Sequence, residues 1–125
     1  MVLAAWMPTS EPDTELRVGE SVRFEAYDLG LTLVDVRSDS RCPVDVTCIR
    51  AGEGVVVLGA SVSGEEPAEL VFAVPPGGSD ERVIEDLRVR IVALSPQAHS
   101  ERKLESKDYV VTVRVERIEV AWRKR

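Results

Sequence analysis

Residues 38–52 read SDSRCPVDVTCIRAG and hold both cysteines of the chain, Cys42 and Cys48. Apolar segments flank this stretch, Leu31–Arg37 before it and Val55–Val62 after it. The second segment is almost wholly apolar, which is typical of a central strand covered on both faces. The stretch therefore predicts a cysteine-containing loop that connects two strands at the centre of a β domain.

Farther from this loop, apolar and polar residues alternate as a half-buried strand requires. The alternating segments are residues 16–26, 70–74, 87–93 and 109–122. We expect a bend or bulge at Gly19–Glu20 in the first. In the last, the apolar residues change from odd to even positions, which predicts a β-bulge near Glu116–Arg117.

Turn-forming residues separate these segments at positions 28–30, 63–67 and 75–80. The polar segment 96–107 indicates an exposed loop or a short helix. About seven or eight strands result, and valine, which packs well on pleated surfaces, is used heavily. The pattern predicts an all-β fold, an antiparallel β-sandwich of jelly-roll or immunoglobulin-like type. A closed barrel is the alternative.

The length of 125 residues fits one domain with a core of its own. We expect an apolar start and flexible linker over residues 1–13, a single sandwich domain over 14–122, and a basic tail over 123–125. If the apolar start forms a strand, Trp6 and Trp122 are expected to pack together at one edge of the sandwich.

The charge of the chain disfavours a nucleic-acid partner, and its lack of long apolar stretches disfavours a membrane span. Its 16 basic and 22 acidic residues give a net charge of −6, and the longest basic run is Arg123–Arg125. Proteins that bind nucleic acid present a basic face to the phosphates, so no nucleic-acid partner is expected. No stretch reaches the ~18 consecutive apolar residues that a membrane span needs, so no membrane-spanning segment is expected.

Four interpretations of the two cysteines compete. A structural zinc site takes about four Cys or His ligands, and beyond Cys42 and Cys48 the chain offers only His99. A catalytic thiol needs a nearby base, and His99 lies far away in a polar segment. A redox dithiol usually has two residues between its cysteines, but here there are five. The main interpretation is a structural disulfide, which stabilises a loop of this size by about 2.4 kcal/mol.

Stable disulfides persist in oxidising compartments. We therefore expect an extracytoplasmic location, either periplasmic, secreted or lipid-anchored, with the export signal absent from this chain.

The block Asp39-Ser40-Arg41-Cys42-Pro43, followed by Cys48 and Ala51-Gly52, resembles an uncharacterised family of bacterial exported or lipoprotein-type domains. Arg50 stands where that family commonly has tryptophan. Weaker similarities are Ser95-Pro96 and Asp108-Tyr109. The resemblance implies an all-β domain at the cell envelope, and it brings no established activity.

Within this block we expect Asp39 and Arg41 to brace the loop. An aspartate accepts hydrogen bonds from nearby backbone N–H groups, and the arginine fork donates to carboxylates or carbonyls. Two alternatives make the region a ligand site. Arg41 and Arg50 would bind an anion, or Asp35, Asp39 and Asp45 would gather around Ca²⁺, which takes several oxygen ligands.

No catalytic or cofactor motif is found, so neither an enzyme nor a cofactor is expected. Adjacent acids at 65–66, 80–81 and 85–86 are expected to be turn-located, solubilising charges, and His99 an exposed loop residue. The leading functional hypothesis is an exported, envelope-associated, non-catalytic binding or structural module, whose partner is an envelope protein or a small ligand. One alternative is an enzyme or accessory domain with a Ca²⁺ or anion site near the disulfide loop. Another is a homo-oligomeric subunit assembled through sheet edges.

Overall fold

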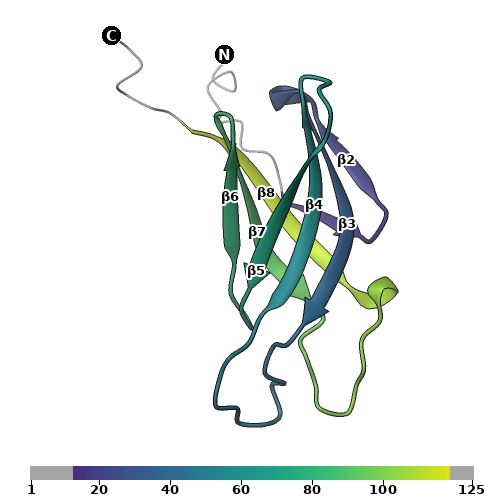
Figure 1. Ribbon diagram of the computed structural model, residues 1–125, viewed down its shortest axis with the longest axis vertical. Coiled ribbons are helices and arrows are strands. Elements are labelled where there is room, and N and C mark those ends of the chain that lie inside the picture. Colours follow the sequence, from purple (N-terminus) through teal and green to yellow (C-terminus); the bar gives the residue numbers. More distant parts are fainter. Residues whose placement is uncertain (1–12, 119–125) are drawn as a thin grey trace, which may run out of the picture.

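This computed structural model describes residues 13–118 of the chain. Within them, two antiparallel sheets of four strands each are joined by loops (Figure 1). In chain order the strands are β1 (Thr14–Arg17), β2 (Ser21–Phe24), β3 (Leu29–Asp39), β4 (Gly54–Val62), β5 (Ala68–Val74), β6 (Asp80–Ile84), β7 (Leu87–Ser95) and β8 (Val110–Arg117). One sheet has the order β1-β8-β7-β6 and the other β2-β3-β4-β5. The sheets do not close into a barrel, so the predicted sandwich is confirmed and the alternative is wrong.

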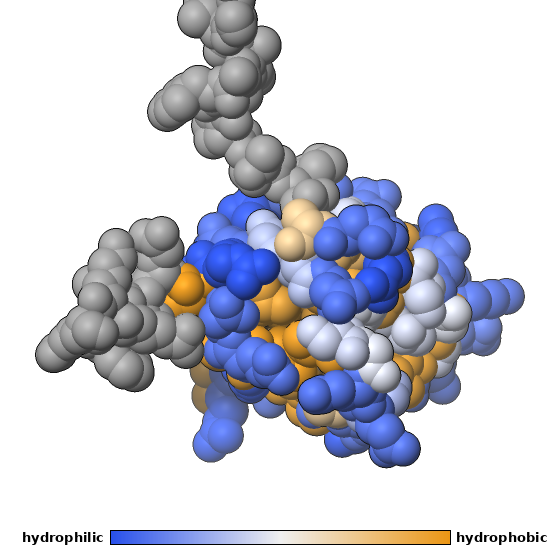
Figure 2. Space-filling model, turned by 90° about the horizontal axis from the view of Figure 1, so that it is seen from above, coloured by the Kyte–Doolittle hydropathy of each residue, from blue (hydrophilic) through white to orange (hydrophobic). Residues whose placement is uncertain are grey.

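The core lies between the two sheets, and most of its members from β5, β7 and β8 are alternating residues that the sequence periodicity predicted. Its fully buried members include Leu87, Val89, Ile91, Val111 and Val113 from one sheet and Leu31, Leu33, Val56, Leu58 and Phe72 from the other. Each such side chain contributes roughly 1.5–3 kcal/mol when it is removed from water. Figure 2 shows the end of the sandwich that is uppermost in Figure 1, where hydrophilic residues surround apolar ones.

Strand β4 is the central strand that the apolar run predicted. It pairs with β3 on one side and β5 on the other, and its consecutive residues Val56, Val57 and Leu58 are all buried. Because successive side chains of a strand point to opposite faces, burial of all three means that both faces are covered here.

The segment predicted as one bent strand over residues 16–26 is two strands in different sheets. β1 pairs with β8, and β2 pairs with β3. The chain crosses between them at Gly19, whose φ of 93° lies in the left-handed region, and the Glu20 N–H bonds to the Arg17 carbonyl at 2.9 Å. A single-turn 3-10 helix, Glu25–Tyr27, then leads into β3. The predicted turn at 28–30 therefore ends earlier, because Leu29 already lies in β3.

Two other expectations about the strands are wrong. β6 was not expected as a strand, yet it pairs with β7 over its whole length. The bulge predicted near Glu116–Arg117 is absent, because both residues pair regularly with β7. The register shifts of the described strands lie instead between Ile91 and Ala93 in β7 and at two points in β3. An extra residue at such a point increases the local twist of the strand.

The first residue of β6 connects the two sheets. A carboxylate oxygen of Asp80 accepts a hydrogen bond from the Ala73 N–H of β5 at 2.8 Å. β5 is the edge strand of one sheet and β6 the edge strand of the other. This side chain therefore joins the sheets along one side of the sandwich.

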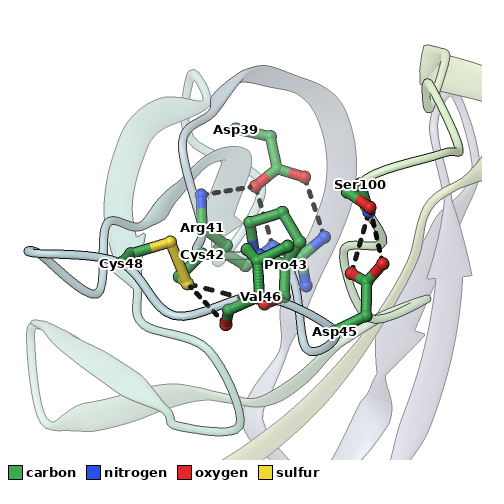
Figure 3. The surroundings of a disulfide bond; sticks show 8 residues. All are labelled: Asp39, Arg41, Cys42, Pro43, Asp45, Val46, Cys48 and Ser100. Atoms are coloured by element: carbon green, nitrogen blue, oxygen red, sulfur yellow. Dashed lines mark hydrogen bonds and ion pairs between the residues drawn. A yellow bond between two sulfur atoms is a disulfide. The ribbon is translucent and has the colours of Figure 1, made fainter.

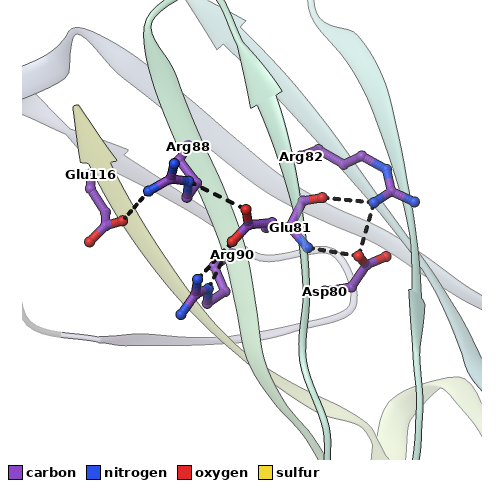
Figure 4. A network of polar contacts seen from close by, with 6 residues as sticks. All are labelled: Asp80, Glu81, Arg82, Arg88, Arg90 and Glu116. Carbon is purple, nitrogen blue, oxygen red and sulfur yellow. Dashed lines mark hydrogen bonds and ion pairs between the residues drawn. The ribbon is translucent and has the colours of Figure 1, made fainter. Parts of the chain in front are cut away.

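The acids Asp80 and Glu81 lie on this strand, not in a turn as predicted. Glu81 accepts hydrogen bonds from Arg90, the shorter at 2.7 Å, and lies 3.4 Å from Arg88 (Figure 4). Arg88 also donates to Glu116 of β8 at 3.1 Å. We call Glu81, Arg88, Arg90 and Glu116 the surface ladder, because their charges alternate across three neighbouring strands.

The two ends of the chain fall largely outside the described residues. The apolar start, the linker through residue 12, the contact of Trp6 with Trp122, and the basic tail 123–125 all lie there. Asp13 is described, and its carboxylate accepts hydrogen bonds from Arg114 of β8 at 2.8 and 3.0 Å. The ordered domain thus includes the last residue that was assigned to the linker.

Candidate functional site

The disulfide between Cys42 and Cys48 is present, as predicted (Figure 3). Backbone hydrogen bonds from Ser40 to Glu53 (2.8 Å) and from Cys42 to Ala51 (2.7 Å) continue the pairing of β3 and β4 into the base of the loop. The Cys42–Cys48 bridge closes the tip beyond them. The loop is consequently held at both its base and its tip.

Gly52 is required at the base of this loop. Its φ is +73°, a conformation that side chains other than glycine rarely adopt, and a Cβ atom there would lie 1.8 Å from the Ser40 carbonyl oxygen. The close approach of the two loop arms therefore depends on the glycine of the Ala-Gly pair.

Arg41 is the only buried charged residue among residues 13–118, with 6% of its surface exposed. Its guanidinium donates to both carboxylate oxygens of Asp39, each at 2.8 Å, and to the carbonyls of Leu94 (3.1 Å) and Pro96 (2.9 Å). Four of its five N–H donors are thus used. The residue connects the end of β3 to the end of β7 and to the segment that follows it.

Tyr109, directly before β8, completes this cluster. Its hydroxyl donates to Asp39 at 2.8 Å. Burial, together with the Asp39 charge, raises the pKa of Tyr109 to about 12. Burial also acts to raise the pKa of Asp39, but hydrogen bonds from Arg41 and Tyr109 outweigh it and hold that pKa below its ordinary value. We call Asp39, Arg41 and Tyr109 the buried triad.

A second loop, residues 96–107, lies beside the disulfide loop at the lower end of the sandwich in Figure 1. The Val44 N–H donates to the Ala98 carbonyl at 2.8 Å. Asp45 accepts hydrogen bonds from the N–H (3.0 Å) and hydroxyl (2.5 Å) of Ser100, which lower its pKa (Figure 3). These hydrogen bonds hold the two loops together, and we call the two segments the clipped loops. Most of residues 96–107 form the predicted exposed loop, which ends in a single-turn 3-10 helix, Ser106–Asp108.

Between the end of β3 and this second loop lies a cleft of about 530 Å³. The buried triad contributes to its lining, with Pro43 and Ala98 from the two clipped loops. The charged and titratable residues around it are Arg37, Asp39, Arg41, His99, Arg102, Lys103, Glu105 and Tyr109. A volume of this size is typical of small-molecule sites.

The charge of this lining differs in sign from that of the whole chain. Asp39 and Arg41 neutralise each other, which leaves the cations Arg37, Arg102 and Lys103 against one carboxylate, that of Glu105. Arg37 has an exposed partner in β5, 3.8 Å away. Arg102 and Lys103 form no ion pair with any residue in 13–118. The cleft is therefore suited to a negatively charged group.

The structure separates the residues that the calcium hypothesis grouped together. Asp35 accepts a hydrogen bond from Ser106, whereas Asp39 belongs to the buried triad and Asp45 to the loop clip. No group of three potential metal ligands occurs within the described part of the chain. The Ca²⁺ hypothesis is therefore wrong for these three residues.

The anion hypothesis for Arg41 and Arg50 fails for a different reason. Arg41 is buried and already paired, and Arg50 is exposed and does not line the cleft. The cations that do line it come from β3 and from the 96–107 loop. The sequence marked that loop as polar and exposed but gave no sign that Arg102 and Lys103 meet Arg37 in space. His99, predicted as an exposed loop residue, is exposed and also lines the same cleft.

Within residues 13–118, no helix has the length and apolar character to cross a bilayer. Comparisons of the chain with protein-family models, with curated proteins and with solved structures found no match.

Proposed function

We propose that this protein is a non-catalytic binding module of the cell envelope that takes an anionic ligand in the cleft between its two clipped loops. The observation that carries this proposal is the pair of cations Arg102 and Lys103, which form no ion pair with the described residues 13–118, on the cleft of a chain whose net charge is −6. A charged side chain gains from a counter-charge, and a ligand carboxylate or phosphate supplies one.

The rigidity of the cleft supports binding. Its floor, the buried triad, is tied to β7 and to the start of β8, and its Pro43 wall belongs to a loop closed by a disulfide. A preformed site loses little conformational entropy when the ligand arrives.

The chemistry of the floor supports the absence of catalysis. A general acid or base works best with a pKa near the operating pH. The pKa of Tyr109 is about 12 and that of Asp39 lies below its ordinary value, so both shifts lead away from neutrality. Arg41 is occupied by Asp39 and two carbonyls. These groups hold the cleft in shape and do not exchange protons with a substrate near pH 7.

The compartment follows in part from the disulfide. A bridge between Cys42 and Cys48 indicates an oxidising, extracytoplasmic environment. Location at the cell envelope, whether periplasmic, secreted or lipid-anchored, is part of the proposal.

Titration calorimetry at low ionic strength tests the site, with inorganic phosphate, sulfate and citrate as probes. We expect at least one of them to bind. The double variant Arg102→Ala, Lys103→Ala should bind it with an affinity reduced at least about tenfold. Arg88→Ala, on the surface ladder, is the matched control and should bind normally. If none of the three anions binds, or if the double variant binds as the wild type does, the proposal is wrong.

A further inference from the structure

The disulfide loop exposes three aliphatic side chains at its tip. Val44 is 51% exposed, Val46 is 46% exposed and Ile49 is completely exposed. We call these three residues the apolar tip. Half of the large apolar residues that are exposed within 13–118 thus lie in one short loop, which the disulfide closes.

The loop cannot easily hide these side chains by folding back. Its arms are paired at the base, its tip is closed by the disulfide, and its Val44 N–H is bound to Ala98 of the neighbouring loop. Figure 1 shows both loops projecting beyond the ends of the strands. The apolar tip is therefore a protrusion held in place, with its apolar surface in water at a cost of about 25 cal/mol per Å².

Cations accompany the apolar tip. Arg50 follows Ile49 directly, and the adjoining loop carries Arg102 and Lys103. The hydrogen bond from Val44 to Ala98 connects the two features, because Ala98 lines the cationic cleft and so does Pro43, the residue before Val44. An apolar protrusion and an anion-binding cleft thus occupy the same end of the sandwich.

We propose that this end of the molecule docks on an anionic lipid bilayer. The headgroup phosphate enters the cleft and the apolar tip inserts among the acyl chains beside it. This inference rests on the proposed function and names the source of its anion. Peripheral membrane proteins combine the same two contributions, namely burial of apolar side chains below the headgroups and attraction of basic side chains to anionic lipid.

The shape and size of the tip favour a bilayer over a protein partner. A stable protein interface takes about 20–30 residues from each side and a complementary surface. The apolar tip offers three side chains on a convex loop. A bilayer needs no pocket of matching shape, because its acyl chains rearrange around whatever side chain is inserted.

Sedimentation with vesicles tests this proposal. We expect the protein to bind vesicles of equal parts phosphatidylcholine and phosphatidylglycerol, to bind phosphatidylcholine vesicles much more weakly, and to be released as salt screens the charges. The double variant Val46→Asp, Ile49→Asp should bind the anionic vesicles with an affinity reduced at least about tenfold, yet bind soluble phosphate as the wild type does.

Val83→Asp is the matched control, because Val83 is 55% exposed but lies on β6, away from the loops. It should bind vesicles normally. The variant Arg102→Ala, Lys103→Ala should lose both vesicle and phosphate binding. Wild-type protein that binds phosphate but not vesicles would overturn the lipid proposal alone, and would leave the tip to a protein partner. Protein that binds neither vesicles nor any of the three soluble anions would overturn the anion site as well. Equal weakening by Val83→Asp and by the tip variant would overturn the role of the apolar tip.

Discussion

The buried triad and the surface ladder use the same chemical groups in opposite environments. In the triad, the side chains of Arg41 and Asp39 are 3% and 12% exposed. In the ladder, those of Arg90 and Glu81 are 38% and 41% exposed. Both pairs have hydrogen-bond distances below 3 Å, so geometry alone does not distinguish them. Their energetic roles differ because water competes for one pair and not for the other.

The two networks have different roles in the fold. The ladder lies across β6, β7 and β8, which backbone hydrogen bonds already join. The triad joins the end of β3 to β7 and to the residue before β8, which belong to the other sheet. Its loss would remove the buried side-chain links between these elements and leave only the exposed ones, such as those between Asp45 and Ser100 and between Asp35 and Ser106. We therefore expect the triad to control stability and the shape of the cleft, and the ladder to contribute little to either.

The sharpest test of this contrast is Arg41→Met, which should lower the free energy of unfolding by about 3–5 kcal/mol. Methionine fills a similar volume but leaves the Asp39 carboxylate and two carbonyls without their donor. Urea unfolding followed by circular dichroism measures the loss. The double variant Asp39→Asn, Arg41→Met also removes the buried charge and should recover part of it. A loss of about 1 kcal/mol or less for Arg41→Met would place the triad with ordinary surface pairs.

The next largest effect is expected for the double variant Cys42→Ser, Cys48→Ser. Removal of the bridge should lower the free energy of unfolding by about 2.4 kcal/mol, because the unfolded loop regains its conformational freedom. The same unfolding measurement applies, with reduced wild-type protein as the matched comparison. The sandwich should keep its far-ultraviolet spectrum, because the triad and the core do not depend on the bridge. A variant as stable as the oxidised wild type would remove the disulfide from the stabilising elements of this end.

Tyr109→Phe should have a smaller effect, about 1–2 kcal/mol, because Asp39 loses one hydrogen-bond donor but keeps Arg41. The loss should depend on pH. The pKa of Tyr109 is about 12 in the folded protein and about 10 in an unfolded chain, so the folded state keeps the proton longer. Its contribution to stability is complete below pH 10 and disappears as the pH rises toward 12. Stability curves of the two proteins should therefore converge in that interval, and parallel curves would contradict this interpretation.

The smallest effect is expected on the surface ladder. Glu81→Gln removes the charge that Arg88 and Arg90 share, and should cost about 1 kcal/mol or less because all three side chains are partly exposed, at 35–41%. The loss should shrink further in high salt, where exposed ion pairs are screened. Thermal unfolding at low and high ionic strength measures both. A cost equal to that of Arg41→Met would erase the difference between the two networks.

The sequence predicted strands wherever one face of a strand is apolar. β7 was found because Leu87, Val89 and Ile91 alternate with arginines, and β4 because its run is apolar throughout. β6 reads DERVI and has no buried residue, so its alternation gave no signal. Period-two patterns also do not report which sheet a strand joins, so the sequence predicts a bend at Gly19 where the chain crosses between the sheets.

The disulfide and the bracing role of Asp39 and Arg41 could be predicted from the sequence because these residues lie close together in the chain. The remainder of the site was not. Tyr109 meets Asp39 across 70 positions, and the Arg41 guanidinium reaches carbonyls more than 50 residues away. In the sequence, Tyr109 is only an apolar strand residue and one of the weaker similarities to the family. The cleft depends on such long-range contacts, and no local pattern encodes them.

One hydrogen bond of the fold has a consequence for self-association. The Ala73 N–H lies on the open edge of β5, where another chain could add a strand, but the Asp80 carboxylate already occupies it. An incoming strand would have to displace an acid and bring its own backbone close to a negative charge, which is how sheet proteins discourage edge-to-edge aggregation. We therefore expect Asp80 to disfavour pairing of a second copy with this part of the β5 edge, in addition to linking the two sheets.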